Sequence, residues 1–150
     1  MQPIPNHPNY YADEDGNIWR KKKNGQFRKF SPSQKTADKP YLGIQLKDAS
    51  GKVRSRYVHH LILETFVGER PSIIHVARHL NDKGDDNRLH NLRWGTPEDN
   101  KNDRLANIAT HKARKAKIIS EMFTKGFSFD EIKDATGWDE NKVRRVCRLK

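Results

Sequence analysis

The sequence predicts an α+β protein with short strands in its first third and helices toward its C-terminal end. The strand prediction rests on "YLGIQL", where Leu42, Ile44 and Leu46 alternate with other residues, which is the period of a half-buried strand. The helix prediction rests on "VHHLILETFVG" and "KIISEMFTKG", where apolar residues recur at helical spacing. Between these two segments, residues 75–100 are too polar to be ordinary core.

The chain is strongly basic. It has 150 residues, with 30 Lys and Arg against 19 Asp and Glu, so its formal net charge is +11. An excess of this size indicates a polyanionic partner, although a basic surface kept only for solubility would look the same. Hydrophobic residues make up 33% of the chain, so the core must be small.

Several classes of protein are excluded by what the sequence lacks. Cys147 is the sole cysteine, which rules out an intramolecular disulfide and a cysteine-based zinc site. No apolar run approaches the roughly 20 residues of a membrane span, and no signal peptide opens the chain. We therefore expect a cytoplasmic protein without a membrane partner.

The first predicted module, residues 1–57, is made of strands. The pair Asp15-Gly16 in "DEDGNIW" is a hairpin-turn signal. "DASGK" turns the chain after "YLGIQL", and "VRSRYV" returns as a second strand. The basic segment "RKKKNGQFRKF" fits either a hairpin edge protected by lysine or a contact with phosphates, and the sequence leaves both open.

The second predicted module, residues 58–106, begins with the helix "VHHLILETFVG", in which Gly68 suits the helix end. "SIIHV" is predicted to be a strand that enters the polar stretch. "TPEDN" is a strong helix start, with Thr96 as cap and Pro97 in the first turn. The predicted order is strand, polar hairpin loop, strand and helix, with Asn100 in the first turn of that helix.

The third predicted module, residues 107–150, is helical. Residues 107–115 are either a linker or a continuing helix, and "KIISEMFTKG" is a helix that ends near Gly126. Ser128 and Glu131 form a capping box for a second helix, and Gly137 makes the next turn. The last helix presents a basic and amide face, made of Asn141, Lys142, Arg144, Arg145 and Arg148.

This C-terminal pattern of helix, "DATGWD" turn and basic helix resembles a helix-turn-helix motif. Such a motif places its last helix in the major groove of double-stranded DNA, so the basic face is predicted to bind DNA. The alternative is a plain three-helix bundle whose charged face is only solvated. We favour DNA contact, because the outward positions of the last helix are basic or amide residues.

The polar stretch carries His79, Asn91 and Asn100, and its most specific part is "RLHNLRWGTPEDN". In their order and spacing these residues resemble the HNH endonucleases of the phage and intron homing type. "YVHHLILETFVG" resembles the helix before the nuclease core of that family, and "YYADEDGNIWR" resembles its N-terminal strand module. The resemblance implies a ββα-metal finger, in which a hairpin and a helix grip one divalent ion.

The resemblance also implies a role for each matching position. His79 matches the general base, Asn91 the residue that braces the hairpin loop, Asn100 a metal ligand, and His59 a supporting histidine outside the finger. The chemistry suits these residue types, because a histidine near neutral pKa can take a proton from water. A hard cation, Mg²⁺ or alternatively Mn²⁺, prefers oxygen ligands and can neutralise charge that grows on the phosphate.

Arg78 is where this sequence departs from the family, because many homing relatives have a metal-binding aspartate before the histidine. An arginine cannot bind a metal ion. The ion could instead be held by Asn100, a DNA phosphate and another carboxylate, either Asp82 or Asp103. The site could also be weakened. We prefer an intact site, in which Arg78 acts in catalysis with His79 and Asn91 by gripping a phosphate with two hydrogen bonds.

The sequence thus predicts a site-directed DNA endonuclease of phage or intron homing type that acts on double-stranded DNA as a monomer or homodimer. It would nick one strand or cut both. The alternative is a DNA-binding regulator with a degenerate HNH core. An RNA-binding protein is less favoured, because no aromatic-rich RNA platform is apparent.

Overall fold

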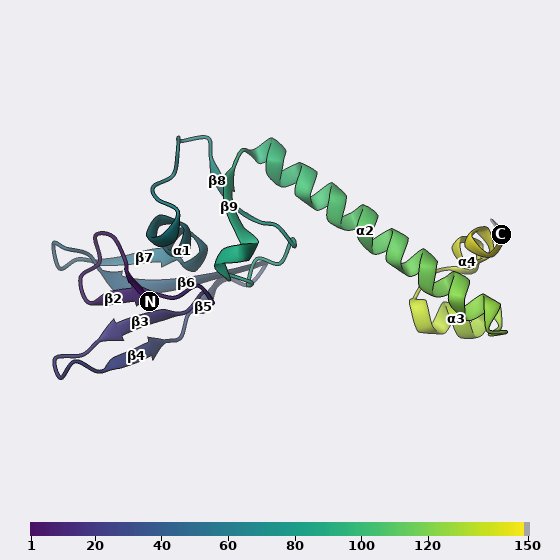
Figure 1. The fold of residues 1–150 in the computed structure, drawn as a ribbon, viewed down its shortest axis with the longest axis horizontal. Coiled ribbons are helices and arrows are strands. Elements are labelled where there is room, and N and C mark those ends of the chain that lie inside the picture. Colours follow the sequence, from purple (N-terminus) through teal and green to yellow (C-terminus); the bar gives the residue numbers. More distant parts are fainter. Residues whose placement is uncertain (149–150) are drawn as a thin grey trace. The chain divides into compact units, whose positions relative to one another are not determined.

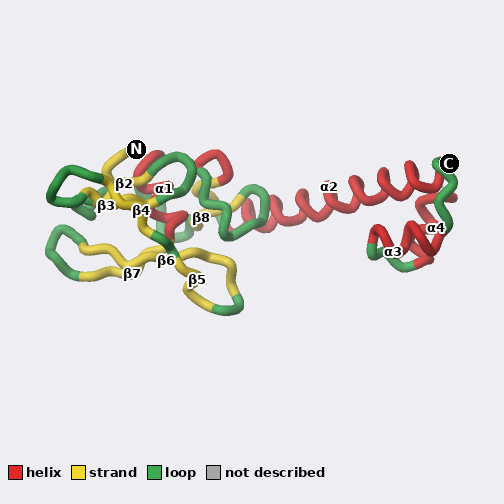
Figure 2. The backbone as a smooth tube through the Cα atoms, turned by 90° about the horizontal axis from the view of Figure 1, so that it is seen from below, coloured by secondary structure: helices red, strands yellow, loops and turns green. Residues whose placement is uncertain are grey.

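The computed structural model describes residues 1–148 and confirms the α+β class (Figure 1). The chain divides into two compact units, Met1–Arg104 and Leu105–Lys150. Among the described residues, three antiparallel sheets lie in the first unit. Figure 2 colours the strands yellow and the helices red, so the change from mainly strand to helix can be followed along the chain.

The first sheet confirms the predicted N-terminal strands. Its four antiparallel strands pair in the order in which they occur, β1 (Gln2–Pro3), β2 (Tyr10–Ala12), β3 (Ile18–Lys21) and β4 (Phe27–Phe30). The β2–β3 turn closes when the Gly16 N–H donates to the Asp13 carbonyl over 3.2 Å. Gly16 has a φ of +85°, which only glycine adopts without strain. The basic segment "RKKKNGQFRKF" forms the β3–β4 hairpin.

The second sheet and the helix that follows it supply most of the core. Its three strands are β5 (Ser33–Thr36), β6 (Lys39–Lys47) and β7 (Val53–Tyr57). Helix α1 (Val58–Phe66) starts directly after β7 and buries Leu61, Ile62 and Leu63 completely. These side chains pack with Ile44 and Leu46 of β6, so the alternation and the helical spacing predicted the buried faces correctly.

The polar stretch forms a hairpin followed by a helix. Strand β8 (Val76–His79) pairs antiparallel with β9 (Leu92–Gly95), and the one-turn 3₁₀ helix η1 (Leu89–Asn91) ends the loop between them. Helix α2 (Pro97–Thr124) follows at once. The Asp99 N–H donates to Thr96 Oγ1 over 3.2 Å, as expected for a Thr96 cap. The strand expected in "SIIHV" starts only at Val76, because a turn joins the His75 N–H to the Ser72 carbonyl.

The second unit contains the end of α2 with α3 (Phe129–Thr136) and α4 (Glu140–Arg148). Ile119 is fully buried there with Ile132 and Val143. The capping box of Ser128 is present, and α3 ends at Gly137 in the left-handed conformation. Residues 107–115 continue α2, so the helix alternative was right and the linker alternative was wrong. No helix in the described chain is long and apolar enough to cross a membrane.

Candidate active site

His79 ends strand β8 and lies at the centre of a packed group of rings. It is 6% exposed. The Tyr41 ring stacks beside it with centroids 5.8 Å apart, and the His59 ring meets it edge-on at 5.1 Å. On a third side, His79 Nε2 lies 3.2 Å from Asn87 Oδ1. The imidazole orientation is therefore fixed by contacts from β6, α1 and the β8–β9 loop.

The contact with Asn87 decides which nitrogen of His79 carries the proton. Asn87 Nδ2 donates to the Asp85 carbonyl over 3.4 Å, which turns Oδ1 toward His79. An amide oxygen only accepts, so Nε2 of His79 donates and Nδ1 keeps its lone pair. Burial lowers the pKa of His79, although the bond to Asn87 and the nearby acidic residues raise it in part. His79 is thus neutral near pH 7, with Nδ1 as the basic nitrogen.

Asn91 holds the two ends of the β8–β9 loop together. Its Oδ1 accepts from the Asn81 N–H at 3.0 Å, and its Nδ2 donates to Asn81 Oδ1 at 3.0 Å and to the Asp86 carbonyl at 2.9 Å. The Asn91 carbonyl also accepts from the Leu80 N–H. These bonds join the start and the end of the loop and so hold the segment that carries Asn87 in place.

Arg78 points to helix α2. Its Nε and Nη2 each donate to Asp103 over 2.8 Å, in a two-point ion pair, and its Nη1 lies 3.7 Å from Asp99 Oδ2. Gly95 makes room for it, because a Cβ there would collide with the Arg78 side chain. The Arg78 side chain is 17% exposed. Asp103 is therefore engaged by Arg78, and the two donors that we expected to grip a phosphate are already in use.

The residues present do not fit a divalent ion. Asn100 is exposed on the first turn of α2, and Asp82 is exposed in the loop, where its N–H donates to the His79 carbonyl. Within residues 1–148, no group of three or more His, Cys, Asp or Glu side chains could hold a metal ion. The two carboxylates on α2 face a guanidinium instead. The predicted ligands Asn100 and Asp82 thus lack a carboxylate cluster to complete a site.

His59 has the most unusual environment in the cluster. It is 6% exposed, its Nδ1 is buried with no hydrogen-bond partner, and its ring stacks on Tyr57 at 5.2 Å. Burial, with the nearby charges of His60, His79 and Lys35, lowers the pKa of His59 to about 3. Buried polar atoms in native proteins almost always have partners, so an orphaned one calls for a functional explanation.

Sequence reasoning missed three neighbours of this cluster. Asn87 is one of several amides in a polar loop, so nothing in the sequence singled it out. Tyr41 lies in the strand predicted from "YLGIQL", where the alternation pointed only to the buried residues. Lys35 of β5 places its Nζ 4.0 Å from the centre of the Tyr57 ring and so brings a cation near the histidines. These contacts span up to 38 residues of sequence, and no local pattern signals them.

The N-terminal hairpin contacts the β8–β9 loop from outside. The Leu89 N–H donates to the Glu14 carbonyl over 2.8 Å. Gly16 in the same turn lies so close that a Cβ there would be 2.6 Å from the Asn87 carbonyl oxygen. The β2–β3 turn therefore packs directly on the residue that orients His79, which links the first sheet to the candidate active site.

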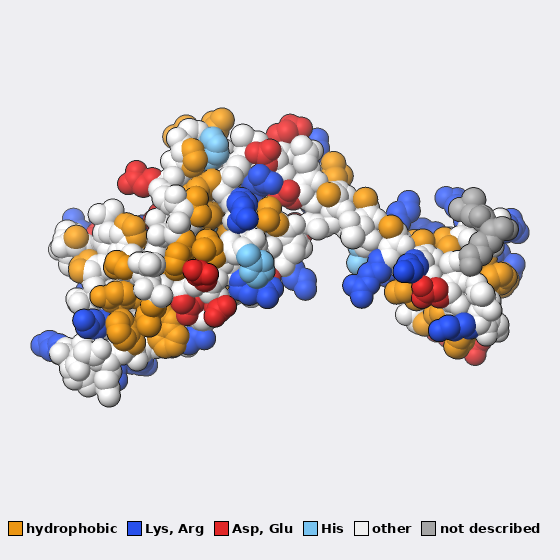
Figure 3. All heavy atoms as spheres, in the orientation of Figure 1, with side chains coloured by type: hydrophobic (Ala, Val, Ile, Leu, Met, Phe, Trp, Pro, Cys, Tyr) orange, Lys and Arg blue, Asp and Glu red, His pale blue; other side chains and the backbone are white. Residues whose placement is uncertain are grey.

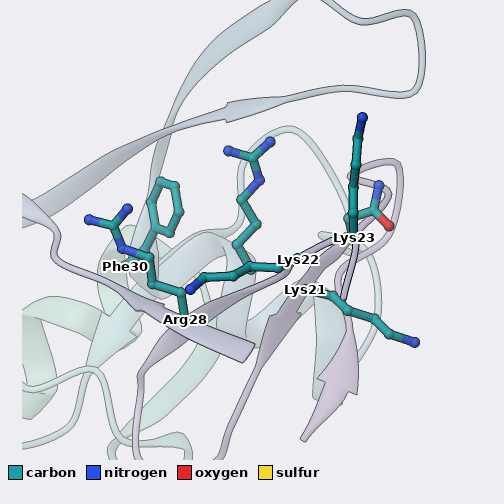
Figure 4. Close-up of a pocket in the computed structure, with 7 residues that line it drawn as sticks. Lys21, Lys22, Lys23, Arg28 and Phe30 are labelled. Carbon is teal, nitrogen blue, oxygen red and sulfur yellow. The ribbon is translucent and has the colours of Figure 1, made fainter. Parts of the chain in front are cut away.

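Basic side chains occur over both units on the face shown in Figure 3. The β3–β4 hairpin forms one pocket (Figure 4). It is lined by Asn9, Arg20, Lys21, Lys22, Lys23, Arg28 and Phe30.

On α4, Lys142 pairs with Asp139 at 2.9 Å and Arg144 with Glu140 at 2.6 Å. Asn141, Arg145 and Arg148 are exposed there. The basic face predicted for the last helix is thus partly neutralised by its own acidic residues.

Comparison with known proteins gives three matches. Residues 56–110 match the family model of the HNH endonucleases. An uncharacterised HNH endonuclease, L245 of Acanthamoeba polyphaga mimivirus, is 26% identical over 153 residues, which cover 99% of this chain and 44% of that protein. The HNH homing endonuclease I-HmuI, in a structure of its DNA binding and cleavage, has a similar fold. Its TM-score is 0.57 at 22% identity, over 99% of this chain and 91% of that one.

The matches differ in what they show. The similarity to I-HmuI concerns the fold, which extends over nearly the whole chain. This chain spans less than half of the length of the mimiviral relative. The family match is confined to the part of the chain that runs from the end of β7 into α2. This is the part that contains His59, His79 and Asn91.

Proposed function

Because the chain carries an HNH endonuclease domain at residues 56–110, we propose that it is a DNA endonuclease that hydrolyses phosphodiester bonds with His79 as general base. The observation that carries this proposal is the fixed His79 ring, with Nε2 bound to Asn87 and Nδ1 left as the basic nitrogen. The domain match and the DNA binding and cleavage of I-HmuI support DNA as the substrate.

In the proposed reaction, His79 Nδ1 takes a proton from a water molecule as the water oxygen attacks the phosphorus. The bond from phosphorus to the leaving sugar oxygen then breaks, and that oxygen takes a proton from solvent water. His79 gives its own proton back to solvent, which restores the neutral base. The lowered pKa of His79 keeps the base neutral at physiological pH, which general-base catalysis requires. Asn87 keeps the proton on Nε2 and so prevents the wrong tautomer from facing the substrate.

HNH nucleases generally use a divalent metal ion, and we predicted Mg²⁺ or Mn²⁺ for this chain. Asn100 would be the protein ligand for that ion, which would supply positive charge beside the phosphate when bound. Of the two carboxylates that could complete its site, Asp103 is engaged by Arg78 and Asp82 is exposed in the loop, so we assign no step to the ion. Positive charge near the histidines comes instead from Lys35, and near α2 from Arg78.

We further propose that the enzyme is site-directed, with the second unit as the reader of DNA sequence. Arg145 and Arg148 are exposed on α4, and the turn before α4 contains Gly137 in the left-handed conformation. These features suit a helix-turn-helix reader, in which α4 would lie in the major groove. The β3–β4 pocket, lined by five Lys and Arg side chains, offers a second contact for phosphates.

A second candidate function is DNA binding without cleavage. Arg78 favours it, because a guanidinium stands where the family resemblance places a metal-binding carboxylate. A regulator with a degenerate HNH core would keep the basic surfaces and lose turnover. The two functions differ in one measurement, the conversion of supercoiled plasmid to nicked or linear DNA.

The test compares wild type with two single-histidine variants in that plasmid assay. His79→Ala should lower the cleavage rate by roughly 10²–10⁴-fold, the usual cost of losing a general base, while DNA affinity stays nearly unchanged. His90→Ala removes an exposed histidine near the end of the same loop and should cleave at the wild-type rate. Equal rates for all three proteins would refute the role of His79, and no cleavage by wild type would favour the regulator.

A further inference from the structure

The α2 side of the finger holds a charge arrangement that the family resemblance does not contain. Asp99 and Asp103 are one helical turn apart, and both face Arg78 of β8. Asp103 takes the two-point contact through Arg78 Nε and Nη2. A cation that belongs to the chain thus lies between the strand and the helix that would otherwise grip a divalent ion.

This ion pair is built into the fold. The three side chains are 17%, 21% and 47% exposed for Arg78, Asp103 and Asp99, and Gly95 gives the Arg78 stem the space it needs. Charge-assisted two-point bonds of this kind are among the strongest hydrogen bonds in proteins. A divalent ion would have to break them and then remain close to a displaced positive charge, which Coulomb repulsion opposes.

We propose that the Arg78 guanidinium is the resident cation of this nuclease site and takes the place of the divalent ion. Asp103 and Asp99 hold the guanidinium, as carboxylates would hold a metal. Nη1 has no part in the two-point contact with Asp103 and lies 3.7 Å from Asp99 Oδ2, beyond hydrogen-bond distance, so we expect it to donate to a phosphate oxygen of the substrate. The phosphate contact rests on the proposed nuclease function. The expected effect of Arg78 on metal binding does not depend on that function.

The first arm of the test measures metal binding by the full-length protein without DNA. Titration with Mn²⁺, followed by electron paramagnetic resonance, should show weak binding to wild type. Arg78→Gln releases Asp99 and Asp103 and should tighten Mn²⁺ binding by roughly tenfold or more, because a nearby positive charge is removed from a partly buried site. The gain should disappear in the double variant Arg78→Gln with Asp103→Asn.

A matched control separates this local effect from a change in net charge. Arg93 is the cross-strand partner of Arg78 on β9, is exposed, and donates to the Leu92 carbonyl over 2.7 Å. Arg93→Gln removes the same charge but should leave Mn²⁺ binding nearly as weak as in wild type, because exposed charges are screened. An equal gain in both variants would overturn the proposal.

Mn²⁺ binding to wild type and to Asp103→Asn tests the proposal even if Arg78→Gln does not fold. Tight binding of one Mn²⁺ ion to wild type, weakened by Asp103→Asn, would show that the metal displaces Arg78 and would overturn the inference. Weak Mn²⁺ binding to wild type that Asp103→Asn leaves unchanged supports it.

The second arm measures plasmid cleavage at constant ionic strength, in Mg²⁺ or in an excess of chelator. We expect wild type to cleave at similar rates in both, and Arg78→Gln to need added metal. A strict metal requirement of the wild type would overturn the inference. Absence of cleavage in every condition would refute the nuclease function alone, because the Mn²⁺ titrations still decide whether Arg78 occupies the metal position.

Discussion

Replacement of His59 by phenylalanine should make the protein less sensitive to acid and, at the same time, lower its cleavage rate. Phenylalanine keeps a ring that can stack on Tyr57 and removes Nδ1, which is buried without a partner. An unsatisfied buried polar atom costs about 1–3 kcal/mol of stability. The variant should therefore be at least as stable as wild type at pH 7.5. The His59 ring also meets the His79 ring edge-on at 5.1 Å, so replacing it should disturb His79 and lower cleavage.

The size of the acid effect follows from the pKa of His59. Burial lowers that pKa from 6.5 to about 3, so the unfolded chain binds a proton between these values and the folded chain does not. The stability from neutral His59 is present above pH 6.5 and is lost as pH falls. Between pH 7.5 and pH 5 this single group should cost about 2 kcal/mol. His60 and His79 act in the same direction, so the comparison with His59→Phe isolates the contribution of His59.

The assay is urea unfolding at both pH values, followed by tryptophan fluorescence. The chain has three tryptophans, so a Trp138→Phe background leaves Trp19 and Trp94, both in Met1–Arg104, as reporters of the unit that contains His59. His90→Phe, an exposed position, serves as the control and should keep the wild-type difference. If His59→Phe loses as much stability on acidification as wild type, or is destabilised at pH 7.5, the reasoning fails.

Two further predictions test the supports of the site and its contact with DNA. Gly16→Ala should lower cleavage more than the control Gly25→Ala. Both glycines have φ near +85°, but only a Cβ at Gly16 would collide with Asn87. Equal cleavage in the two variants would exclude a role for the hairpin contact. Replacing Arg145 and Arg148 together by glutamine should reduce the salt dependence of DNA binding by about two phosphate contacts, a drop of roughly 2 in the slope of log affinity against log salt concentration. Band-shift titrations at several salt concentrations measure that slope, and an unchanged slope would show that α4 does not touch the phosphates.

Local patterns predicted the elements of this fold well. Alternation found β6, helical spacing found α1, and the Thr96 and Ser128 caps marked the starts of α2 and α3 within a residue. Each signal acts within a few residues, where the sequence is informative. The start of β8 was predicted too early for the same reason. The apolar residues of "SIIHV" fit a strand, but they fit a turn with exposed side chains equally well, and the structure has the turn.

The environment of His79 could not be predicted in this way. Spacing singled out His79, but its three fixed contacts come from Tyr41, His59 and Asn87, which belong to a strand, a helix and a loop. Which amide faces the imidazole depends on the path of the loop, and Asn91 sets that path through bonds to both of its ends. The family resemblance implied a bracing role for Asn91, whereas its effect on the position of Asn87 could be seen only in the structure.

His79 and Arg78 are neighbours at the end of β8 and have different partners. His79 contacts His59 of α1 and Asn87 of the β8–β9 loop, whereas Arg78 contacts Asp99 and Asp103 of α2. A change from carboxylate to guanidinium at position 78 therefore alters the charge beside Asp103 and leaves the contacts of His79 with Asn87 intact. The ion pair needs both members, because Asp103 without Arg78 would be a half-buried carboxylate with no partner for its charge. The Arg78–Asp103 pair therefore acts as a unit between β8 and α2, and its removal should leave the His79–Asn87 contact in place.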